Sequence, residues 1–394
     1  MEDLKSIRER YLDRLVNDEL PFWLEHGIDR VNGGIYTCLD RDGSLLDTDK
    51  SVWFQGRALW VFAHAYNTIE KRPEYLEACR LLVDFIERHC FDTDGRMFFR
   101  VTADGKGVTK RIRYFFSETF AIVGFAQYAI ASGDDSYKEK AMRLFENVER
   151  IRTTPGILIP KNDPEVRPTR SFAGPMILLN VLSELRAACP ERDEWITCYI
   201  RKMLKEIETY FWRPELGCVL EEVAYDGSIN ADHFEGRIIN PGHAIEGAWF
   251  IMNEARYEKD GHYMKLGLEI LDAMWEKGWD SEFGGGIIQY RDAFGKSLSE
   301  YHHGMKFWWP QCEALIANLM AYRETGNEKY LEHFFEVEKY VEERFVDREY
   351  GEWFGYFYRD GKRSTDLKGN LYKGPFHIPR MYMKCIEIID SMDL

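Results

Sequence analysis

The chain has 394 residues, 45% of them apolar, and its 67 acidic and 52 basic side chains give a net charge of −15. This length fits one large domain or two to three average ones, with enough apolar sequence for a sizeable core. The acidic balance and the absence of any run of five basic residues argue against nucleic acid or an anionic membrane as a partner.

The chain begins with MEDLKSIRERYLDRL, which predicts a charged amphipathic helix rather than a signal peptide. No apolar segment approaches the roughly 18 residues of a membrane span. The eight cysteines are scattered without a CxxC pair, which disfavours zinc ribbons and thioredoxin-like redox sites. We therefore expect a soluble, cytoplasmic protein.

Short glycine-containing loops recur along the whole chain, with successive spacings of 61, 61, 61, 68 and 66 residues, at Gly34, Gly95, Gly156, Gly217, Gly285 and Gly351. Most of these loops continue into alternating apolar sequence that ends in an Asp-Gly pair, as in GGIYTCLDRDGSLL, MFFRVTADGKGV and CVLEEVAYDGSI. Asp-Gly between alternating apolar residues is a strong signal for a β-hairpin. The loops therefore predict a hairpin in most units of an internal repeat.

Two helical segments lie between successive hairpins. The first is apolar nearly all round, as in ETFAIVGFAQYAIA and AGPMILLNVLSEL, and the second is amphipathic, as in YLEHFFEVEKYVEERF. A helix that is apolar on every side is buried on every side, whereas a striped helix faces water. The units are longer than tetratricopeptide or HEAT repeats, which makes an open solenoid a poorer fit. We predict an all-α fold, an (α/α)6 barrel formed by one domain over residues 1–394, with short β-hairpins on one rim.

Polar side chains gather where the inner helices begin, and the hairpins lead into the same rim. They include Gln55, Arg57, Ser117, Glu118, Asn240, His243, Glu246, Lys306, Gln311, Glu313, His377 and Arg380, together with Trp308 and Trp309. Each has a structural explanation when taken alone, since acidic groups near a helix start favour the macrodipole and tryptophans usually pack in cores. In a closed ring, however, these helix starts converge on the axis. We therefore predict an axial polar pocket, with Asn180 deeper in the third inner helix as a buried amide or pocket wall.

Two histidines, an arginine and several carboxylates suit proton transfer next to a carbonyl group. Histidine titrates near neutrality and serves as either base or acid, and an arginine stabilises an oxyanion or enolate. Such chemistry requires no cofactor. We expect no metal, because a site built on His243 and Glu246 needs matching motifs on other helices.

Two other classes of function remain open at this point. Glu118, Glu246 and Glu313 could supply the two carboxylates of a glycoside hydrolase, which (α/α)6 barrels also host. Trp308 and Trp309 could instead form a binding surface without turnover. Neither alternative requires two histidines at the barrel axis.

Several long segments of the chain resemble the N-acylglucosamine 2-epimerase family over nearly the full length, including DTDKSVWFQGRALW, FEGRIINPGHAIEGAWFIM, MKFWWPQCEA and YKGPFHIPR. The resemblance implies an (α/α)6 barrel that interconverts N-acetylglucosamine and N-acetylmannosamine at C2 of the open-chain sugar. The roles that it implies are an acid/base pair (His243 and His377), an enolate-binding arginine supported by a second one (Arg57 and Arg380), and partners of the histidines (Glu246 and Glu313).

The resemblance also implies pocket residues and leaves related substrates open. Trp309, Glu118, Asn180 and Lys306 are expected to bind the substrate. Mannose isomerases or 2-epimerases and cellobiose 2-epimerases belong to the same superfamily, but the PFHIPR ending favours an N-acyl sugar, because cellobiose epimerases usually differ around the second histidine.

The remaining expectations concern regulation by ATP and the oligomeric state. ATP is a candidate allosteric activator, since it stimulates some family members, although the chain has no P-loop and EFGGGIIQYRD is better explained by a tight hairpin loop. We also expect a homodimer whose ligand is a small amino sugar.

Overall fold

The computed structural model describes residues 3–112, 114–159 and 162–392. The first two residues of the expected N-terminal helix and both ends of the expected 1–394 domain therefore lie outside the described residues. Within the described part, no helix is both long and apolar enough to cross a membrane.

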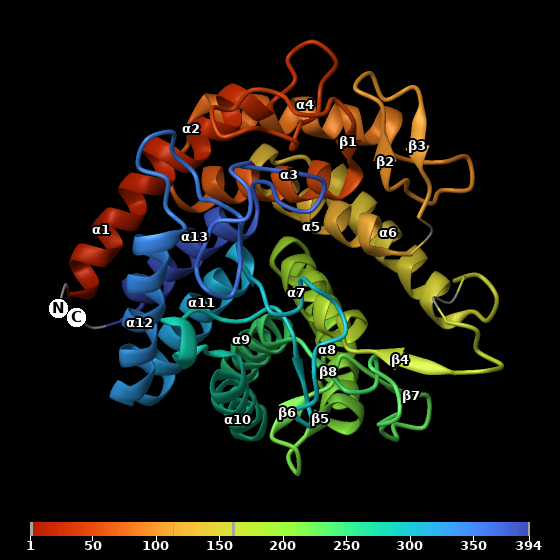
Figure 1. The fold of residues 1–394 in the computed structure, drawn as a ribbon. Coiled ribbons are helices and arrows are strands. Elements are labelled where there is room, and N and C mark those ends of the chain that lie inside the picture. Colours follow the sequence, from red (N-terminus) through yellow and green to blue (C-terminus); the bar gives the residue numbers. More distant parts are fainter. Residues whose placement is uncertain (1–2, 113, 160–161, 393–394) are drawn as a thin grey trace.

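Six helices form an inner ring around the axis of the molecule (Figure 1): α3 (Val52–Thr68), α5 (Phe116–Ser132), α7 (Ala173–Ala188), α9 (Pro241–Glu258), α11 (Trp308–Thr325) and α13 (His377–Asp390). Each packs against the next, and α13 packs against α3, so the ring is closed. Burial explains the all-round apolar sequence, since every residue of α5 from Ser117 to Ala129 is buried. The predicted (α/α)6 barrel is confirmed.

An outer ring of amphipathic helices covers the inner one: α4 (Pro73–His89), α6 (Ser136–Thr153), α8 (Asp193–Glu206), α10 (Gly261–Gly278) and α12 (Glu328–Arg344). A π-helical segment, η4 (Ile207–Phe211), extends α8, and short 3-10 turns occupy η3 (Pro190–Arg192) and η5 (Ser281–Phe283). The sixth outer position is filled by the N-terminal run of α1 (Leu4–Arg14), η1 (Leu15–Glu19), α2 (Leu20–Phe22) and η2 (Trp23–Gly27), in which α1 packs against α13. The start of the described chain therefore lies against its end (Figure 1).

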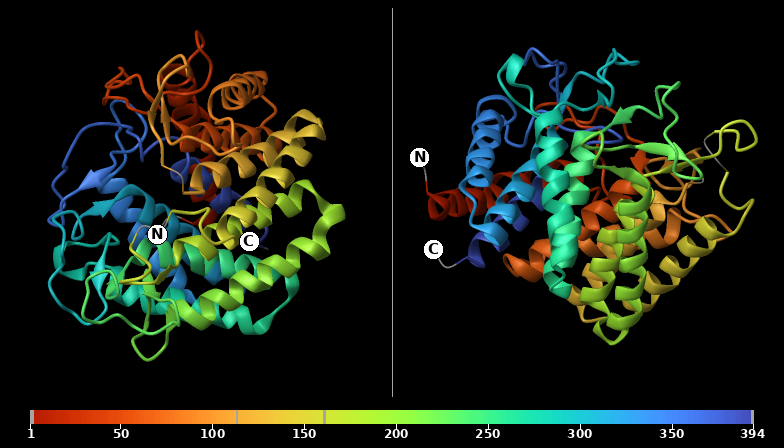
Figure 2. Two further views of the ribbon diagram at one scale, coloured as in Figure 1. Left: turned by 90° about the vertical axis from the view of Figure 1, so that its right-hand side faces the viewer. Right: turned by 90° about the horizontal axis from the view of Figure 1, so that it is seen from below.

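Short antiparallel strands lie near one end of the helices (Figure 2): β1 (Lys50–Ser51), β2 (Arg100–Val101), β3 (Val108–Lys110), β4 (Thr169–Ser171), β5 (Trp212–Arg213), β6 (Cys218–Val219), β7 (Glu222–Ala224), β8 (Ile238–Ile239), β9 (Arg291–Asp292), β10 (Lys306–Phe307) and β11 (Tyr356–Phe357). β1, β2 and β3 form one sheet, and the other pairs are β4–β7, β5–β6, β8–β9 and β10–β11. Most of these pairings join successive units of the repeat. A bridge between Leu39 and Gly369 joins the first unit to the last.

The Asp-Gly turns form as predicted, but the strands around them are shorter than a simple hairpin repeat implies. Gly43, Gly105, Gly227 and Gly361 all have φ between 70° and 89°, a left-handed conformation that glycine adopts without steric cost. Of these turns, the one at Gly105 connects two named paired strands, β2 and β3. Because strand pairs also link neighbouring units, the rim stabilises the closed ring as well as each unit.

A buried lysine–aspartate pair recurs at the rim and fixes several glycine loops. Lys50 Nζ lies 2.7 Å from Asp29 Oδ2, and Lys368 Nζ lies 2.9 Å from Asp347 Oδ2. Each ammonium group also donates to a carbonyl oxygen of the adjacent loop, Gly33 in the first case and Gly351 in the second. A charge buried in this way requires such a partner and hydrogen bonds.

The inner helices α3 and α5 approach each other closely because both carry glycine at the contact. A Cβ atom built on Gly56 would lie 2.4 Å from the backbone of Phe120, and one on Gly124 would lie 2.7 Å from the carbonyl oxygen of Gly56. The close contact places Phe120 against the next residue of α3, Arg57, whose guanidinium carbon lies 3.9 Å from the ring centroid.

Candidate active site

A cavity of about 770 Å³ opens at the rim where the inner helices begin. All six inner helices contribute to its wall, through Trp53 and Arg57 (α3), Phe116 and Phe120 (α5), Met176 and Asn180 (α7), His243 and Glu246 (α9), Trp308 and Trp309 (α11), and His377 and Arg380 (α13). The predicted convergence of the helix starts on one axial pocket is therefore observed. A cavity of this size is typical of sites for small organic ligands.

Arg57 presents an uncommitted cation to the cavity. Its guanidinium lies over the faces of Phe120 and Phe376, 3.9 and 4.8 Å from the ring centroids, and its side chain makes no ion pair within the described part of the chain. The buried Nε has no hydrogen-bond partner. Burial lowers the pKa of Arg57 to about 9, with Arg380 acting in the same direction against the opposing charge of Glu246. The group remains charged at neutral pH and is ready to bind an oxygen atom of a ligand.

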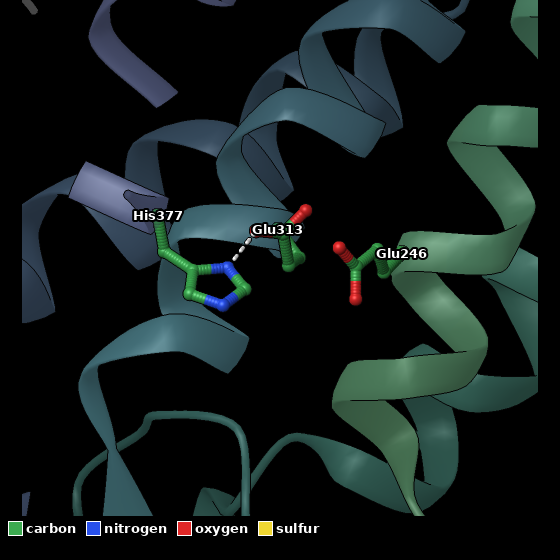
Figure 3. A group of neighbouring side chains, drawn as sticks. All are labelled: Glu246, Glu313 and His377. Atoms are coloured by element: carbon green, nitrogen blue, oxygen red, sulfur yellow. Dashed lines mark hydrogen bonds and ion pairs between the residues drawn. The ribbon is translucent and has the colours of Figure 1, made fainter. Parts of the chain in front are cut away.

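His377, at the start of α13, is held by the carboxylate of Glu313 (Figure 3). Its Nδ1 lies 2.8 Å from Glu313 Oε1, and Glu313 Oε2 accepts a 2.8 Å hydrogen bond from Trp249 Nε1. An Nδ1–H group that donates to Glu313 leaves Nε2 unprotonated, which is how a carboxylate fixes the tautomer of a histidine. Burial, followed by the charges of Arg380 and Arg57, holds the pKa of His377 well below its usual value. His377 is therefore neutral and suited to act as a base.

Arg380 connects the carboxylates at the floor of the cavity. Its Nη2 donates to Glu313 Oε1 over 2.7 Å and also to Glu246 Oε1. Glu246, Glu313 and His377 lie close enough to share a cation (Figure 3), but the guanidinium of Arg380 already contacts both carboxylates. We assign the charge balance of this cluster to Arg380.

His243, at the start of α9, has a different partner. Its Nδ1 lies 3.1 Å from Glu221 Oε2, and its backbone N–H donates to the side chain of Asn240, which caps the helix. Burial by itself lowers the pKa of His243, but the charge and hydrogen bond of Glu221, helped by Glu246 and Glu313, outweigh it and raise the pKa. His243 therefore favours the protonated form and is suited to act as an acid.

Glu221 was not predicted from the sequence, and its contact corrects the expected pairing. Glu246, which was expected to position a histidine, accepts a hydrogen bond from Arg380 instead, whereas Glu221 on the β6–β7 connection contacts His243. The signal in the sequence was an acidic residue directly after the buried run CVL on the rim. Spacing along α9 could not reveal this partner, because it belongs to the preceding hairpin.

Trp309 packs beside both histidines. Its ring centroid is 5.0 Å from that of His243 and 5.8 Å from that of His377. Gly242 permits this position, since a Cβ atom at Gly242 would lie 2.6 Å from the indole ring. The indole is thus a common neighbour of two imidazoles that approach the cavity from α9 and α13.

The remaining predicted pocket residues differ in position. Asn180 lines the cavity, and its side chain makes no hydrogen bond within the described part of the chain. Glu118 instead accepts hydrogen bonds from the N–H of Met97 and from Arg96 Nε, away from the cavity wall. Lys306 is also absent from that wall and pairs with Asp280 over 3.2 Å, in the same arrangement as the lysine–aspartate pairs at the rim. The structure thus gives Glu118 and Lys306 structural positions rather than the predicted substrate contacts.

The two perturbed histidines indicate the chemistry that the site performs. Environments that push two titratable groups in opposite directions assign one as base and the other as acid. His377, with its lowered pKa, and His243, with its raised pKa, fit removal of a proton from one face of a planar carbon and its return to the other. Arg57 supplies the positive charge that the intervening enolate requires.

Comparison with known proteins finds relatives over nearly the whole chain. The family model described as N-acylglucosamine 2-epimerase (GlcNAc 2-epimerase) matches residues 34–374. The chain is 36% identical over 410 residues to the N-acylglucosamine 2-epimerase of Bos taurus, which covers 99% of this chain and 93% of the relative. It is 33% identical over 402 residues to that of Mus musculus, covering 98% and 91%. The structure of cellobiose 2-epimerase from Bacillus thermoamylovorans B4167 has the same fold, with a TM-score of 0.85 at 20% identity, covering 97% of this chain and 99% of that one.

Proposed function

Because this chain belongs to the N-acylglucosamine 2-epimerase family, we propose that it interconverts N-acetylglucosamine and N-acetylmannosamine. The enzyme is an isomerase that acts on carbohydrates. The observation that carries the proposal is the pair of oppositely perturbed histidines, His377 and His243, at one cavity beside an unpaired arginine, Arg57.

The reaction begins with the open-chain aldehyde form of the sugar. Nε2 of His377 removes the proton from C2, and the electron pair of the broken C–H bond forms the enolate, whose oxygen at C1 is bound by Arg57. Nε2–H of His243 then donates a proton to the opposite face of C2, which restores the aldehyde with inverted configuration. The reverse reaction exchanges the roles of the two histidines, as microscopic reversibility requires.

The committed carboxylates disfavour the hydrolase alternative. A glycosidase needs one carboxylic acid and one free carboxylate on either side of the scissile bond. Glu246 and Glu313 both accept from Arg380, and Glu118 accepts from Arg96. The acid and base of this site are therefore imidazoles, which serve proton transfer at carbon.

The proposal is tested by incubating the protein with N-acetylmannosamine in deuterated water and observing C2 by NMR. We expect N-acetylglucosamine to appear with deuterium at C2, because the returning proton comes from a histidine that exchanges with solvent. Free mannose and cellobiose, offered separately, should give much lower kcat/KM. Fructose formed from mannose with higher efficiency would identify a mannose isomerase, and the absence of both exchange and product would leave a binding protein.

We further propose that the chain is one catalytic domain that acts in the cytoplasm as a homodimer, requires no cofactor for the chemistry and responds to ATP. ATP would bind away from the glycine loop at Gly284–Gly286, because Cβ atoms at Gly285 and Gly286 would meet the rings of Trp279 and Tyr340 within 2.8 Å. Rates measured with and without ATP test the response to ATP, and the mass from analytical ultracentrifugation tests the homodimer.

A further inference from the structure

One wall of the cavity is apolar, and it is formed by α5 and α7. Ala173, Met176, Ile177 and Asn180 all line the cavity, and their spacing of i, i+3, i+4 and i+7 places them on one face of α7. Phe116 continues the wall on α5. We call these five residues the α5–α7 wall. Asn180 is its one polar member.

The α5 part of this wall lies across the axis from α11, which carries Trp309, and the α7 part lies beside α9 and across from α13. The inner helices pack in the order α3, α5, α7, α9, α11, α13, so α5 is three positions from α11 in a closed ring of six. Trp309 on α11 lies close to both His243 and His377. A substrate carbon that both histidines reach therefore lies near the indole, with α5 across the axis from the indole and α7 beside the helix that carries His243.

The planar intermediate limits where the groups on C2 point. The histidines exchange protons at the two faces of C2, so C1, C3 and the nitrogen lie in the plane between those faces. C1 must bring its oxygen to Arg57, because that is the uncommitted cation of the cavity. Two substituents of C2 then remain to be placed: the nitrogen with its acyl group, and C3 with its hydroxylated chain. One of them points to the α5–α7 wall and the other to the mouth of the cavity.

The mouth suits the hydroxylated chain. Its lining carries hydroxyl and amide groups, from Ser364, Thr365, Asn370 and Tyr372. Hydroxyl groups that lose water without gaining a hydrogen bond are costly, which excludes the polyol from an apolar wall. A methyl group, in contrast, gains free energy when it leaves water for apolar side chains.

We propose that the α5–α7 wall binds the N-acyl group of the substrate, an inference that rests on the proposed epimerase function. The acyl carbon chain packs against Ala173, Met176, Ile177 and Phe116. The side chain of Asn180, which has both a donor and an acceptor and no hydrogen bond within the described protein, pairs with the amide. The wall thereby selects N-acylated sugars and accepts acyl chains longer than acetyl.

The test uses open-chain alditols, which bind without reacting, and measures Kd by calorimetry. The ligands are 2-acetamido-2-deoxymannitol, its N-propanoyl analogue and mannitol, which has no acyl group. In the unmodified protein, the N-propanoyl compound should bind up to about fourfold more tightly than the acetyl compound, the equivalent of one buried methylene at about 0.8 kcal/mol. An equal or weaker affinity of the N-propanoyl compound would overturn the proposal.

Two matched variants locate the effect. Ala173→Leu adds bulk to the wall and should weaken binding of the acetamido alditol at least tenfold while mannitol changes less than twofold. Ser364→Leu adds comparable bulk at the mouth and should weaken both ligands by similar factors. If Ala173→Leu weakens both ligands equally, the acyl group does not contact this wall. Since calorimetry requires no turnover, these outcomes are distinct from failure of the epimerase assay.

Discussion

Glu221 is expected to control the alkaline limb of the pH–rate profile through His243. Glu221→Gln removes the negative charge beside Nδ1 of His243 and keeps a side chain of nearly the same shape. His243 must be protonated to donate to C2, and its raised pKa, with Glu221 as the main attractive cause, extends that protonated form to higher pH. Without this charge the pKa of His243 falls, so the activity declines at a lower pH than in the unmodified enzyme.

The size of the shift follows from the contact. Nδ1 and Oε2 are 3.1 Å apart, and the two side chains are 28% and 17% exposed, so solvent screens the pair only in part. A hydrogen bond to a charged group contributes about 1.5–3 kcal/mol, which corresponds to about 1–2 pKa units. We therefore expect the alkaline limb of kcat/KM to move down by about 1–2 pH units and the acid limb, set by His377, to stay in place.

The assay is kcat/KM for N-acetylmannosamine over a pH series. Glu222→Gln on the same hairpin is the matched control, since the carboxylate of Glu222 accepts from Asn162 Nδ2 and does not contact His243 in the described structure. That control should retain the limb of the unmodified enzyme. A folded Glu221→Gln enzyme whose alkaline limb stays within about 0.3 pH units of normal, equivalent to about 0.4 kcal/mol, or whose acid limb moves instead, would refute this assignment.

Three further variants test the other parts of the site. Arg57→Lys keeps the charge but loses the planar fork, so kcat should fall at least ~10-fold, about 1.4 kcal/mol in the transition state; a change in KM alone would indicate ground-state binding. His377→Asn should abolish net epimerisation yet allow His243 to exchange the C2 hydrogen of one epimer, as NMR in deuterated water would detect, and near-normal turnover would remove His377 from the base role. Lys306→Met leaves Asp280 without one of its cations in a buried site and should lower the free energy of unfolding by about 3 kcal/mol in urea titrations. The kcat/KM of the folded variant should stay within about twofold of normal. A large change in KM would instead show that Lys306 contacts the substrate.

The floor of the site shows why the arginines have different roles. Arg380 is buried and bound to two carboxylates, which raise its pKa against the cost of burial. Arg57 is surrounded by aromatic rings instead, and its pKa is lowered. The first guanidinium is therefore committed to holding Glu246 and Glu313, and the second is available to the substrate.

Local patterns in the sequence were sufficient for the architecture. All-round apolar helices alternate with striped ones because burial acts on each helix separately, and this alternation predicted the inner and outer rings. The Asp-Gly turns also formed, because left-handed φ values are accessible to glycine in any surroundings. The pairing of strands between successive units was not predictable, since backbone hydrogen bonds between distant segments leave no periodic signal in either segment.

The types of residue at the site were visible in the sequence, but their partners were determined by the tertiary structure. The i, i+3 spacing of His243 and Glu246 suggested a pair, yet Glu221 contacts His243 from 22 residues away and Arg380 contacts Glu246 from 134 residues away. Helical spacing fixes which side chains share a face, whereas the closed ring decides what each face meets. The sequence by itself therefore determined the barrel and its set of histidines, arginines and carboxylates. The fold decided which histidine has a lowered pKa and which a raised one, because a pKa depends on burial and on charges brought together across the ring.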